Sequence, residues 1–309
     1  MIKGARTVVT QCLNIKPFEK VLIVTDRKML KFGEILYKAS REVNKESFIM
    51  VMEPRSRNGE EPPEPITEAM RASDVVIAPT FCSLTHTKAR IKACKEGVRI
   101  ATMPRISKFS FTKGGLTADY RIVKKLTEKM HSLVRNSREA EIESENGTKV
   151  SMSIRGRKWK KDTGIIYNLG DYGNLPGGEV FIAPIETSTN GKIVFDHFEL
   201  SEGKIKLTVA NGIVKKVNGN AKKLLKIFNE LGRKARIIAE LGIGTNPKAR
   251  IIGNLLEDEK VMGTCHIAMG NNMGFGGKNN VPFHMDGIIK KPTLKIDGKI
   301  LIKDGRWLV

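Results

Sequence analysis

The sequence predicts a two-domain protein, with an α/β domain over residues 1–110 and a larger α+β domain over residues 111–309. Three observations support this prediction. The chain has 309 residues, which is long for a single domain. Its first third alternates short apolar runs with helix-period segments, which predicts a parallel sheet with flanking helices. The remainder alternates polar and apolar residues around Asn-Gly pairs, which predicts antiparallel hairpins.

The first domain is predicted to hold parallel strands separated by helices. Its apolar, β-branched runs lie at residues 20–25, 47–52, 74–80 and 98–103. The helix-period segments between them lie at residues 28–43, 65–73 and 85–96. Continuous apolar strands that alternate with helices indicate a sheet that is covered on both faces. The sequence of this domain contains no GxGxxG or Walker loop, so it carries no nucleotide-binding fingerprint.

The second domain is predicted to follow a connecting helix at residues 117–135 and to consist mainly of hairpins. Asn-Gly pairs mark three expected turns, at Asn146-Gly147, Asn190-Gly191 and Asn211-Gly212. A further helix is expected at residues 219–232. The remaining expected strands lie at residues 235–240, 263–270, 293–298 and 299–305. These elements together predict an α+β domain.

The bulk composition indicates a globular cytoplasmic protein. Hydrophobic residues make up 40% of the chain, yet no apolar stretch approaches the roughly 20 residues that span a bilayer. The N-terminus lacks the apolar segment and the cleavage site of a signal peptide. The four cysteines, Cys12, Cys82, Cys94 and Cys265, form no CxxC pair, which fits free thiols in a reducing compartment.

The formal net charge of +21 is the most unusual bulk property. Such a charge suits a partner that is a polyanion, because Lys and Arg neutralise phosphates. The basic residues are nevertheless spread along the whole chain, and the one dense cluster is RGRKWKK at residues 155–161. No DNA- or RNA-binding signature accompanies this cluster. We therefore expect at most weak, non-specific nucleic acid binding, with a polyanion-binding protein as a further alternative function.

Two of the five histidines lie close together in the sequence and point to a metal site. His266 lies in the run GTCHIAMG, and His284 precedes Asp286 in the run PFHMD. In a strand with a side-chain period of two, His266 shares a face with small residues, while Cys265 faces the other side. His284 and Asp286 likewise share a face, and an HxD pair can chelate one ion through nitrogen and oxygen. The other histidines, His86, His131 and His197, lack such spacing and are expected at the surface or in turns.

Two glutamates and one loop extend this constellation. Glu240 is expected at the end of the strand ARIIAE, where a buried carboxylate is costly unless it is paired or bound to a metal. Glu179 follows two glycines that allow a close approach of backbone. The Gly- and Asn-rich loop 270–280, which includes Asn271, Asn272 and Met273, suits the binding of a substrate.

Four motifs in the same order resemble the leucyl aminopeptidase (aminopeptidase T) family of metallopeptidases. They are NLPGGEVFIAP, AELGIGTNP, EDEKVMGTCHIAMG and HMDGIIKKPTLKIDG, and the first 110 residues match the family's N-terminal domain more loosely. The resemblance implies a homodimeric exopeptidase whose site holds two ions of zinc, cobalt or manganese. The ligands that it implies are Glu179, Glu240, His266, His284 and Asp286, and one of the two glutamates bridges the ions. In such sites the metals activate a water molecule and polarise the scissile carbonyl.

The sequence departs from that family at Met273, where the aminopeptidases have a tyrosine that stabilises the tetrahedral intermediate. The loss of one such donor typically costs about 10²–10³ in rate. Tyr172 is a candidate to replace it, and Glu240 and Glu259 are candidates for the general base. Our first expectation is therefore a metal-dependent aminopeptidase-like hydrolase.

A relative in the same superfamily, the iron-dependent 2,5-dihydroxypyridine dioxygenase, also resembles this sequence. It implies one Fe(II) held by two histidines and an aspartate, which correspond to His266, His284 and Asp286. Two histidines and one carboxylate with open positions suit non-haem Fe(II) chemistry with dioxygen. A mononuclear ring-cleaving dioxygenase is therefore the alternative function.

Overall fold

A computed structural model describes all 309 residues of the chain and divides them into two compact units. The first unit comprises Met1–Lys125, Asp162–Gly178 and Asn246–Glu257, and the second comprises Leu126–Lys161, Glu179–Thr245 and Asp258–Val309. The structure thus does not follow the single boundary expected at residue 110. The reason is that two later segments return to the first unit. Residues 172–174 add a strand to its sheet, and Asn246 donates side-chain hydrogen bonds to the carbonyl oxygens of Gly115 and Gly177.

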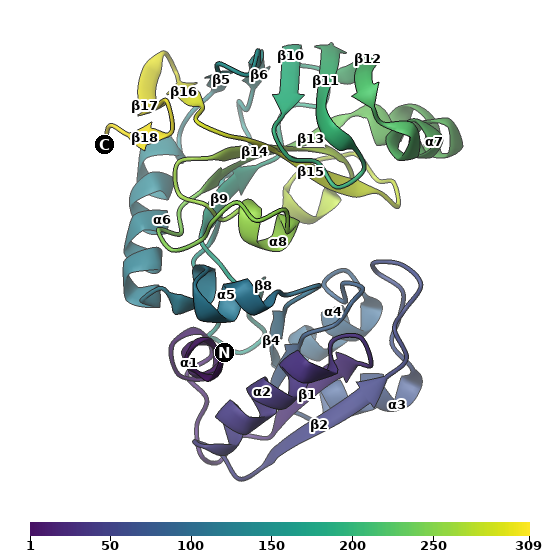
Figure 1. The fold of residues 1–309 in the computed structure, drawn as a ribbon, viewed down its shortest axis with the longest axis vertical. Coiled ribbons are helices and arrows are strands. Elements are labelled where there is room, and N and C mark those ends of the chain that lie inside the picture. Colours follow the sequence, from purple (N-terminus) through teal and green to yellow (C-terminus); the bar gives the residue numbers. More distant parts are fainter. The chain divides into compact units, whose positions relative to one another are not determined.

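The first unit contains the predicted parallel sheet, which has the strand order β2-β1-β3-β4-β8 (Figure 1). Its strands are β1 (Val21–Asp26), β2 (Ser47–Met52), β3 (Val75–Ala78), β4 (Arg99–Thr102) and β8 (Tyr172–Asn174), and all of its pairings are parallel. Its helices include α1 (Ile2–Thr7), α2 (Leu30–Arg41), α3 (Glu64–Arg71), α4 (Lys88–Lys95) and α5 (Lys108–Thr112). The sheet is covered on both faces, as predicted. Ile23 packs in one apolar cluster with Leu36 of α2, whereas Val24 packs in another with Met70 of α3.

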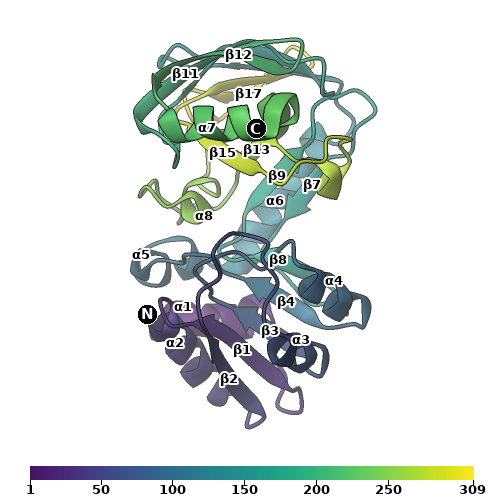
Figure 2. The ribbon, with the colours of Figure 1, turned by 90° about the vertical axis from the view of Figure 1, so that its right-hand side faces the viewer.

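The second unit is built from two sheets around one apolar core (Figures 1 and 2). The eight-stranded sheet has the order β12-β11-β10-β6-β5-β16-β17-β18, and the five-stranded sheet has the order β15-β14-β13-β9-β7. The strands of the larger sheet are β5 (Glu139–Glu143), β6 (Lys149–Ser153), β10 (Asn190–Phe195), β11 (Glu202–Ala210), β12 (Ile213–Asn220), β16 (Thr293–Ile296), β17 (Lys299–Lys303) and β18 (Arg306–Trp307). Those of the smaller sheet are β7 (Lys160–Asp162), β9 (Glu179–Ile182), β13 (Ile238–Gly244), β14 (Cys265–Gly270) and β15 (His284–Ile289).

Three helices accompany the strands of the second unit. Helix α6 (Tyr120–Val134) and the short helix α8 (Leu255–Asp258) each include residues of both units, whereas α7 (Lys222–Leu231) belongs to the second unit alone. Phe228 of α7 packs in the apolar core. Helices α6 and α7 confirm the helices that the sequence predicts near residues 117–135 and 219–232.

Two of the three expected Asn-Gly hairpins are present. Asn146-Gly147 joins β5 to β6, and Asn211-Gly212 joins β11 to β12 with both residues at positive φ, as a tight hairpin turn requires. The hairpin expected at Asn190-Gly191 is wrong, because these residues begin β10 and pair with β6. Glycine is needed at position 191 for another reason. Its φ is +131°, and a Cβ there would collide with the carbonyl oxygen of Lys149.

Two expectations from composition concern membrane segments and cysteines. No helix in the structure is both long enough and apolar enough to cross a membrane. All four cysteines are free thiols, and three of them, Cys12, Cys82 and Cys265, are buried. The expectation of unpaired cysteines is therefore confirmed.

Candidate metal centre

The five-stranded sheet of the second unit has one apolar face and one polar face. On β14, the apolar core contains Cys265, Ile267 and Met269, whereas the buried His266 stands on the opposite face. The side-chain alternation predicted for this strand is therefore confirmed. On β13, Leu241 packs in the same core, so Glu240 faces the polar side with His266.

Small residues make room for large polar side chains on this face. Gly242 of β13 pairs with His266 of β14, and a Cβ at position 242 would collide with the imidazole ring. Ala268 pairs with Glu240 on one side and with Asp286 on the other. Its methyl group leaves space between the two carboxylates. Glycine and alanine at these positions therefore let the side chains of three strands converge.

Glu240 lies within β13, not at the end of a strand as the sequence suggested. The strand continues to Gly244, because the residues that follow Glu240 pair with both β9 and β14. The register with β14 shifts between Ile238 and Glu240, which indicates a β-bulge at Ala239. Bulges redirect side chains next to functional sites. This bulge sets the side on which Glu240 stands.

Glu240 stands between the two histidines and offers one oxygen to each. Its Oε1 lies 3.7 Å from Nε2 of His266, and its Oε2 lies 3.3 Å from Nε2 of His284. Each histidine also has a second carboxylate. Nε2 of His266 lies 3.3 Å from Oε2 of Glu179, and Nε2 of His284 lies 3.4 Å from Oδ2 of Asp286. The structure thus brings together all five residues that the sequence suggested as ligands.

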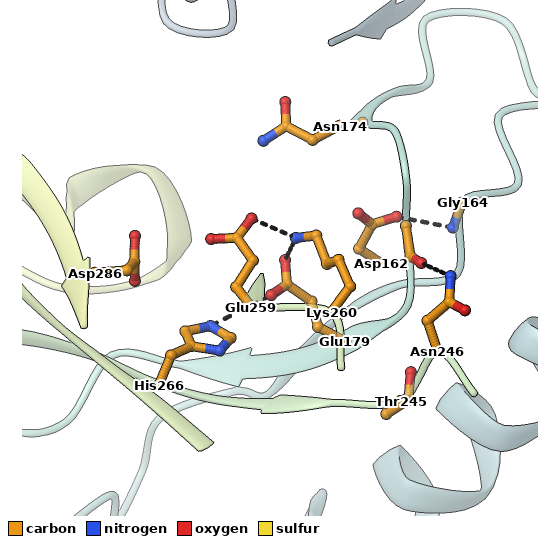
Figure 3. A network of polar contacts seen from close by, with 12 residues as sticks. Asp162, Gly164, Asn174, Glu179, Thr245, Asn246, Glu259, Lys260, His266 and Asp286 are labelled. Atoms are coloured by element: carbon orange, nitrogen blue, oxygen red, sulfur yellow. Dashed lines mark hydrogen bonds and ion pairs between the residues drawn. The ribbon is translucent and has the colours of Figure 1, made fainter. Parts of the chain in front are cut away.

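These five residues form two groups that share Glu240. Ligand atoms of Glu240, His284 and Asp286 all lie within 4.8 Å of one another, which suits one metal ion. His266 faces Glu179 instead (Figure 3). The ring of His284 is fixed by a hydrogen bond between its Nδ1 and the carbonyl oxygen of Asn271 at 2.7 Å. This bond leaves Nε2 of His284 directed at the carboxylates, as is usual for metal-binding histidines.

Lys260 is a buried member of the site that sequence reasoning missed. Only 1% of its surface is exposed, and its Nζ lies 2.5 Å from Oε1 of Glu179 and 2.7 Å from Oε1 of Glu259 (Figure 3). A buried charge is costly unless it is paired. Lys260 therefore neutralises part of the negative charge around Glu179, and it leaves Oε2 of that glutamate on the side of His266.

Burial and the neighbouring charges shift the pKa values of these groups. Burial alone would lower the pKa of His266, but the neighbouring carboxylates of Glu179 and Glu240 raise it well above its usual value. Burial would also lower the pKa of His284, but Asp286 and Glu240 raise it well above its usual value. Burial would raise the pKa of Glu179, but the positive charges of Lys260 and His266 lower it.

Glu259 behaves differently from the other carboxylates of the site. Burial raises the pKa of Glu259 to about 8, even though Lys260 opposes the shift. Near neutral pH this carboxyl therefore holds a proton. Glu259 lies beside Lys260, next to the cluster, and its catalytic role stays a prediction.

Three buried polar atoms of the cluster have no hydrogen-bond partner. They are Oε2 of Glu179, Nδ1 of His266 and Oδ1 of Asp286. Buried polar atoms are nearly always satisfied, and the exceptions require an explanation. The two orphan carboxylate oxygens lie in a group that also holds Nε2 of His266 and of His284, and such oxygens and nitrogens are suitable donors for a divalent metal. The residues present therefore fit a metal centre.

Buried hydrogen bonds hold the loop after β14, which was expected to bind a substrate. Asn272 is fully buried, and its side chain donates to Glu186 and accepts from the backbone N–H of Asn279. It therefore holds the loop together and is not available to a substrate. Met273 is 54% exposed, whereas Phe275 contacts the ring of His284 edge-on, with the centroids 6.0 Å apart.

Tyr172, His131 and His197 each have a contact of their own with a residue outside the five suggested ligands. Tyr172 is in β8 of the first unit, where the guanidinium of Arg90 lies 3.8 Å from the centre of its ring. It is not part of the unit that holds the metal cluster. His131 lies on α6 near the carbonyl oxygen of Trp159. His197 is partly buried, and its Nε2 lies 3.7 Å from Oδ2 of Asp258, so it is more than a surface residue.

Comparisons with known proteins bear on the whole chain. A sequence model of the family described as NicX: 2,5-dihydroxypyridine 5,6-dioxygenase matches residues 1–309. The structure of 2,5-dihydroxypyridine dioxygenase from Pseudomonas putida KT2440 is similar, with a TM-score of 0.79 and 16% identity over 100% of this chain and 97% of that chain. Wild-type AmpT from Thermus thermophilus is similar too, with a TM-score of 0.76 and 17% identity over 100% of this chain and 98% of that chain. No curated protein matches the sequence. At these identities the two structures show a shared fold.

Proposed function

The chain belongs to the 2,5-dihydroxypyridine 5,6-dioxygenase family, and within that fold we propose that it is a metal-dependent hydrolase that releases N-terminal residues from peptides. The observation that carries this proposal is the position of Glu240, which presents one oxygen to each histidine. A carboxylate shared in this way suits two ions. This chain shares its fold with AmpT and with the Pseudomonas dioxygenase at similar sequence identities. The fold alone therefore favours neither the hydrolase nor the dioxygenase reaction.

The five residues divide naturally between two divalent ions. Glu179, His266 and one oxygen of Glu240 would hold the first ion, and the other oxygen of Glu240 with His284 and Asp286 would hold the second. Zinc, cobalt or manganese suits such a set of nitrogen and oxygen donors. When bound, paired ions of this kind activate a water molecule and polarise a carbonyl group.

The chain's own residues would supply proton transfer and charge balance. In the metal-free protein burial raises the pKa of Glu259 to about 8, and a carboxyl whose pKa lies near the working pH suits a general acid or base. Lys260 would keep Oε1 of Glu179 occupied, so that Oε2 is the oxygen offered to the centre. Met273 cannot donate a hydrogen bond to a developing oxyanion, so we expect slow turnover.

A second candidate is the ring-cleaving dioxygenase reaction with one Fe(II), and a specific observation favours it. The aromatic rings of Phe181 and Phe275 lie 5.6 Å apart, and Phe275 also contacts His284. Such rings suit a flat aromatic substrate beside the centre. The family match over the full chain favours this reaction as well. His266, His284 and Asp286 would then hold the iron.

Metal content and product analysis distinguish the two candidates. The metal-free protein is reconstituted with zinc, cobalt or manganese, and separately with Fe(II) under anaerobic conditions. The ions bound per chain are then counted. Hydrolysis of a panel of amino-acid anilides and oxygen consumption with dihydroxypyridine are measured on each form. Two bound ions with release of N-terminal residues support the hydrolase.

One bound iron with ring cleavage would replace the hydrolase by the second candidate. The variant Met273→Tyr adds a further arm to the test. It restores a donor at the position where the aminopeptidases have one, so it should raise hydrolysis by up to about 10²-fold. If Met273→Tyr leaves hydrolysis absent with every metal, the peptidase proposal fails.

A further inference from the structure

The loop after β14 carries two of the groups that contact His284. The backbone carbonyl oxygen of Asn271 lies 2.7 Å from Nδ1 of His284, and the ring of Phe275 contacts that imidazole edge-on. Phe275 also contacts the ring of Phe181 on β9, with the centroids 5.6 Å apart. The orientation of His284 therefore depends on where this loop lies.

Glu186 holds this loop from a turn that lies outside it. Oε1 of Glu186 accepts hydrogen bonds from the side chain of Asn272 at 3.1 Å and from the backbone N–H of Lys278 at 2.6 Å. Its Oε2 lies 2.5 Å from Nη2 of Arg157, whose Nη1 donates to the carbonyl oxygen of Gly276. One carboxylate and its cation thus hold the loop at three positions.

The pair of Glu186 and Arg157 is itself well fixed. The two side chains are only 16% and 12% exposed, so solvent screens their attraction less than it would at the surface. The backbone N–H of Ile185 donates to the carbonyl oxygen of Ser153 on β6. A Cβ at Gly212 would collide with the carbonyl oxygen of Glu186, so glycine lets that hairpin pack against the turn. Glu186 is therefore anchored to the eight-stranded sheet.

The Glu186 carboxyl is ionised at neutral pH. Burial would raise its pKa, but the backbone N–H of Lys278, the side chain of Asn272 and the charge of Arg157 hold the pKa below its usual value. Hydrogen bonds to an ionised acceptor are shorter and stronger than those between neutral groups. A neutral residue at this position would therefore hold the loop less tightly.

We propose that Glu186 is a positioning residue of the metal centre and acts on His284 through Asn272 and the carbonyl oxygen of Asn271. This role rests on the metal centre proposed above and adds to it a residue outside the five ligands. Asn271 and Asn272 share one peptide unit, so the bond from Glu186 to Asn272 fixes the carbonyl group that faces Nδ1 of His284. Partners of this kind orient a metal-binding histidine, and their loss typically costs about 10–100-fold in metal affinity.

Metal binding by the full-length protein tests this role. The metal-free protein is titrated with Co²⁺, and the visible absorption of the bound ions gives their dissociation constants. Glu186→Ala should raise the dissociation constant of the ion whose binding His284→Ala abolishes, by at least about tenfold. Glu186→Gln keeps an oxygen for Asn272 and Lys278 but loses the charge, so it should fall between Glu186→Ala and the wild type. A Glu186→Ala protein that binds Co²⁺ as tightly as the wild type would overturn the proposal.

Asp297→Ala is the matched control in the same unit. Asp297 also holds a turn through its carboxylate, because its Oδ1 accepts from the backbone N–H groups of Arg138 and Glu139 at 2.9 Å. It lies between β16 and β17 of the eight-stranded sheet, so its loss should lower the melting temperature but leave the Co²⁺ dissociation constants unchanged. Equal weakening of metal binding in Asp297→Ala and Glu186→Ala would mean that Glu186 acts only through general stability, and the positioning role would fail.

A double-mutant cycle tests the route through Asn272. Glu186→Ala and Asn272→Ala remove the two ends of one hydrogen bond, so the double variant should bind Co²⁺ about as weakly as the weaker single variant. Losses that add in full would show that the two residues act independently, which would exclude this route. Asn272→Ala also keeps the test available if Glu186→Ala does not fold.

Nuclear magnetic resonance of the metal-free protein gives a readout that needs no bound ion. The proton on Nδ1 of His284 should exchange slowly with water in the wild type and in Asp297→Ala, because the carbonyl oxygen of Asn271 holds it. In Glu186→Ala this signal should be lost to fast exchange, and its persistence there would contradict the proposal. If the wild type bound no Co²⁺, the metal centre itself would fail, whereas this signal would still decide whether Glu186 positions His284.

Discussion

Two buried aspartates, one in each unit, show what distinguishes a structural carboxylate from a candidate ligand. Asp26 ends β1 of the first unit and is fully buried, yet both of its oxygens accept hydrogen bonds from the backbone N–H groups of Lys28, Met29 and Phe81. Asp286 lies within β15 of the second unit, and its Oδ1 has no hydrogen-bond partner. Both aspartates are therefore buried, and they differ in whether all their carboxylate oxygens have hydrogen-bond partners.

The two sheets that contain these aspartates differ in where their polar side chains lie. The first unit's sheet is apolar on both faces, so a polar residue such as Asp26 occurs at the end of a strand, where backbone N–H groups are available. The five-stranded sheet of the second unit gathers carboxylate and imidazole side chains on one face. Glycine and alanine between those residues replace the apolar side chains that would otherwise fill the space. A sheet face built in this way indicates a binding site.

The largest expected effect is on metal binding. Asp286→Ala should lose at least one ion per chain, because it removes the carboxylate that completes the group with Glu240 and His284. His266→Ala should also lose an ion, and His131→Ala should lose none. Elemental analysis of the dialysed proteins measures this. Equal metal content in the three variants would remove the basis of the proposed site.

Asp26→Ala is the matched control in the first unit. It leaves three backbone N–H groups without their acceptor, so it should lower the free energy of unfolding by about 3 kcal/mol or more while metal content stays unchanged. Asp286→Ala in the metal-free protein should have a smaller effect on stability. Urea unfolding of both variants measures the difference. If the metal-free Asp286→Ala protein were the less stable of the two, the distinction between the aspartates would be lost.

A smaller effect is expected from the removal of the buried lysine. Lys260→Met should lower the free energy of unfolding of the metal-free protein by about 3 kcal/mol, because it leaves the buried carboxylate of Glu179 without its cation. The loss should shrink when metal is bound, since the ions then supply positive charge. Urea unfolding with metal and with a chelator measures both values. An equal loss in the two conditions would indicate that Lys260 acts only through packing.

The elements with a regular period could be predicted from the sequence. The apolar runs of β1 to β4 and the side-chain alternation of β14 follow from the spacing of residues alone. The same is true of the turn at Asn211-Gly212, where both residues adopt the positive φ that the pair favours. These features depend on neighbours within a few residues, which is the information that a single sequence contains.

Features that depend on distant partners could not be predicted in this way. β8 has only three residues and no apolar run, and its pairing with β4 determines its place. Lys260 follows Glu259 in the sequence and resembles an ordinary surface pair, whereas its role depends on Glu179, which is 81 residues away. Gly191 resembles a turn glycine but is required by contact with β6. The five ligands themselves were suggested by resemblance, and the structure shows that they meet.

The smallest expected effect is a pH dependence that differs between the metal-free and the metal-bound protein. In the metal-free protein the pKa values of His266 and His284 are raised, so their contribution to stability is complete below about pH 6.5 and is lost as the pH rises through the raised values. Glu259 acts in the same direction, because its pKa of about 8 makes the folded state hold a proton that the unfolded state has already lost. The free energy of unfolding should therefore fall by up to about 1.4 kcal/mol per pH unit for each group.

Metal binding should reverse this trend, since a metal requires the neutral imidazole and displaces its proton. The gap in stability between the metal-bound and metal-free protein should then widen as the pH rises from about 6 to about 9. Thermal unfolding with metal and with a chelator across this range measures the gap, and calorimetry in two buffers counts the protons released. The first unit provides an internal reference, because Asp26 already accepts three backbone N–H groups and offers a metal nothing. If the two curves ran parallel, the histidines would not be the groups that exchange protons for metal, and the contrast between the two aspartates would need another explanation.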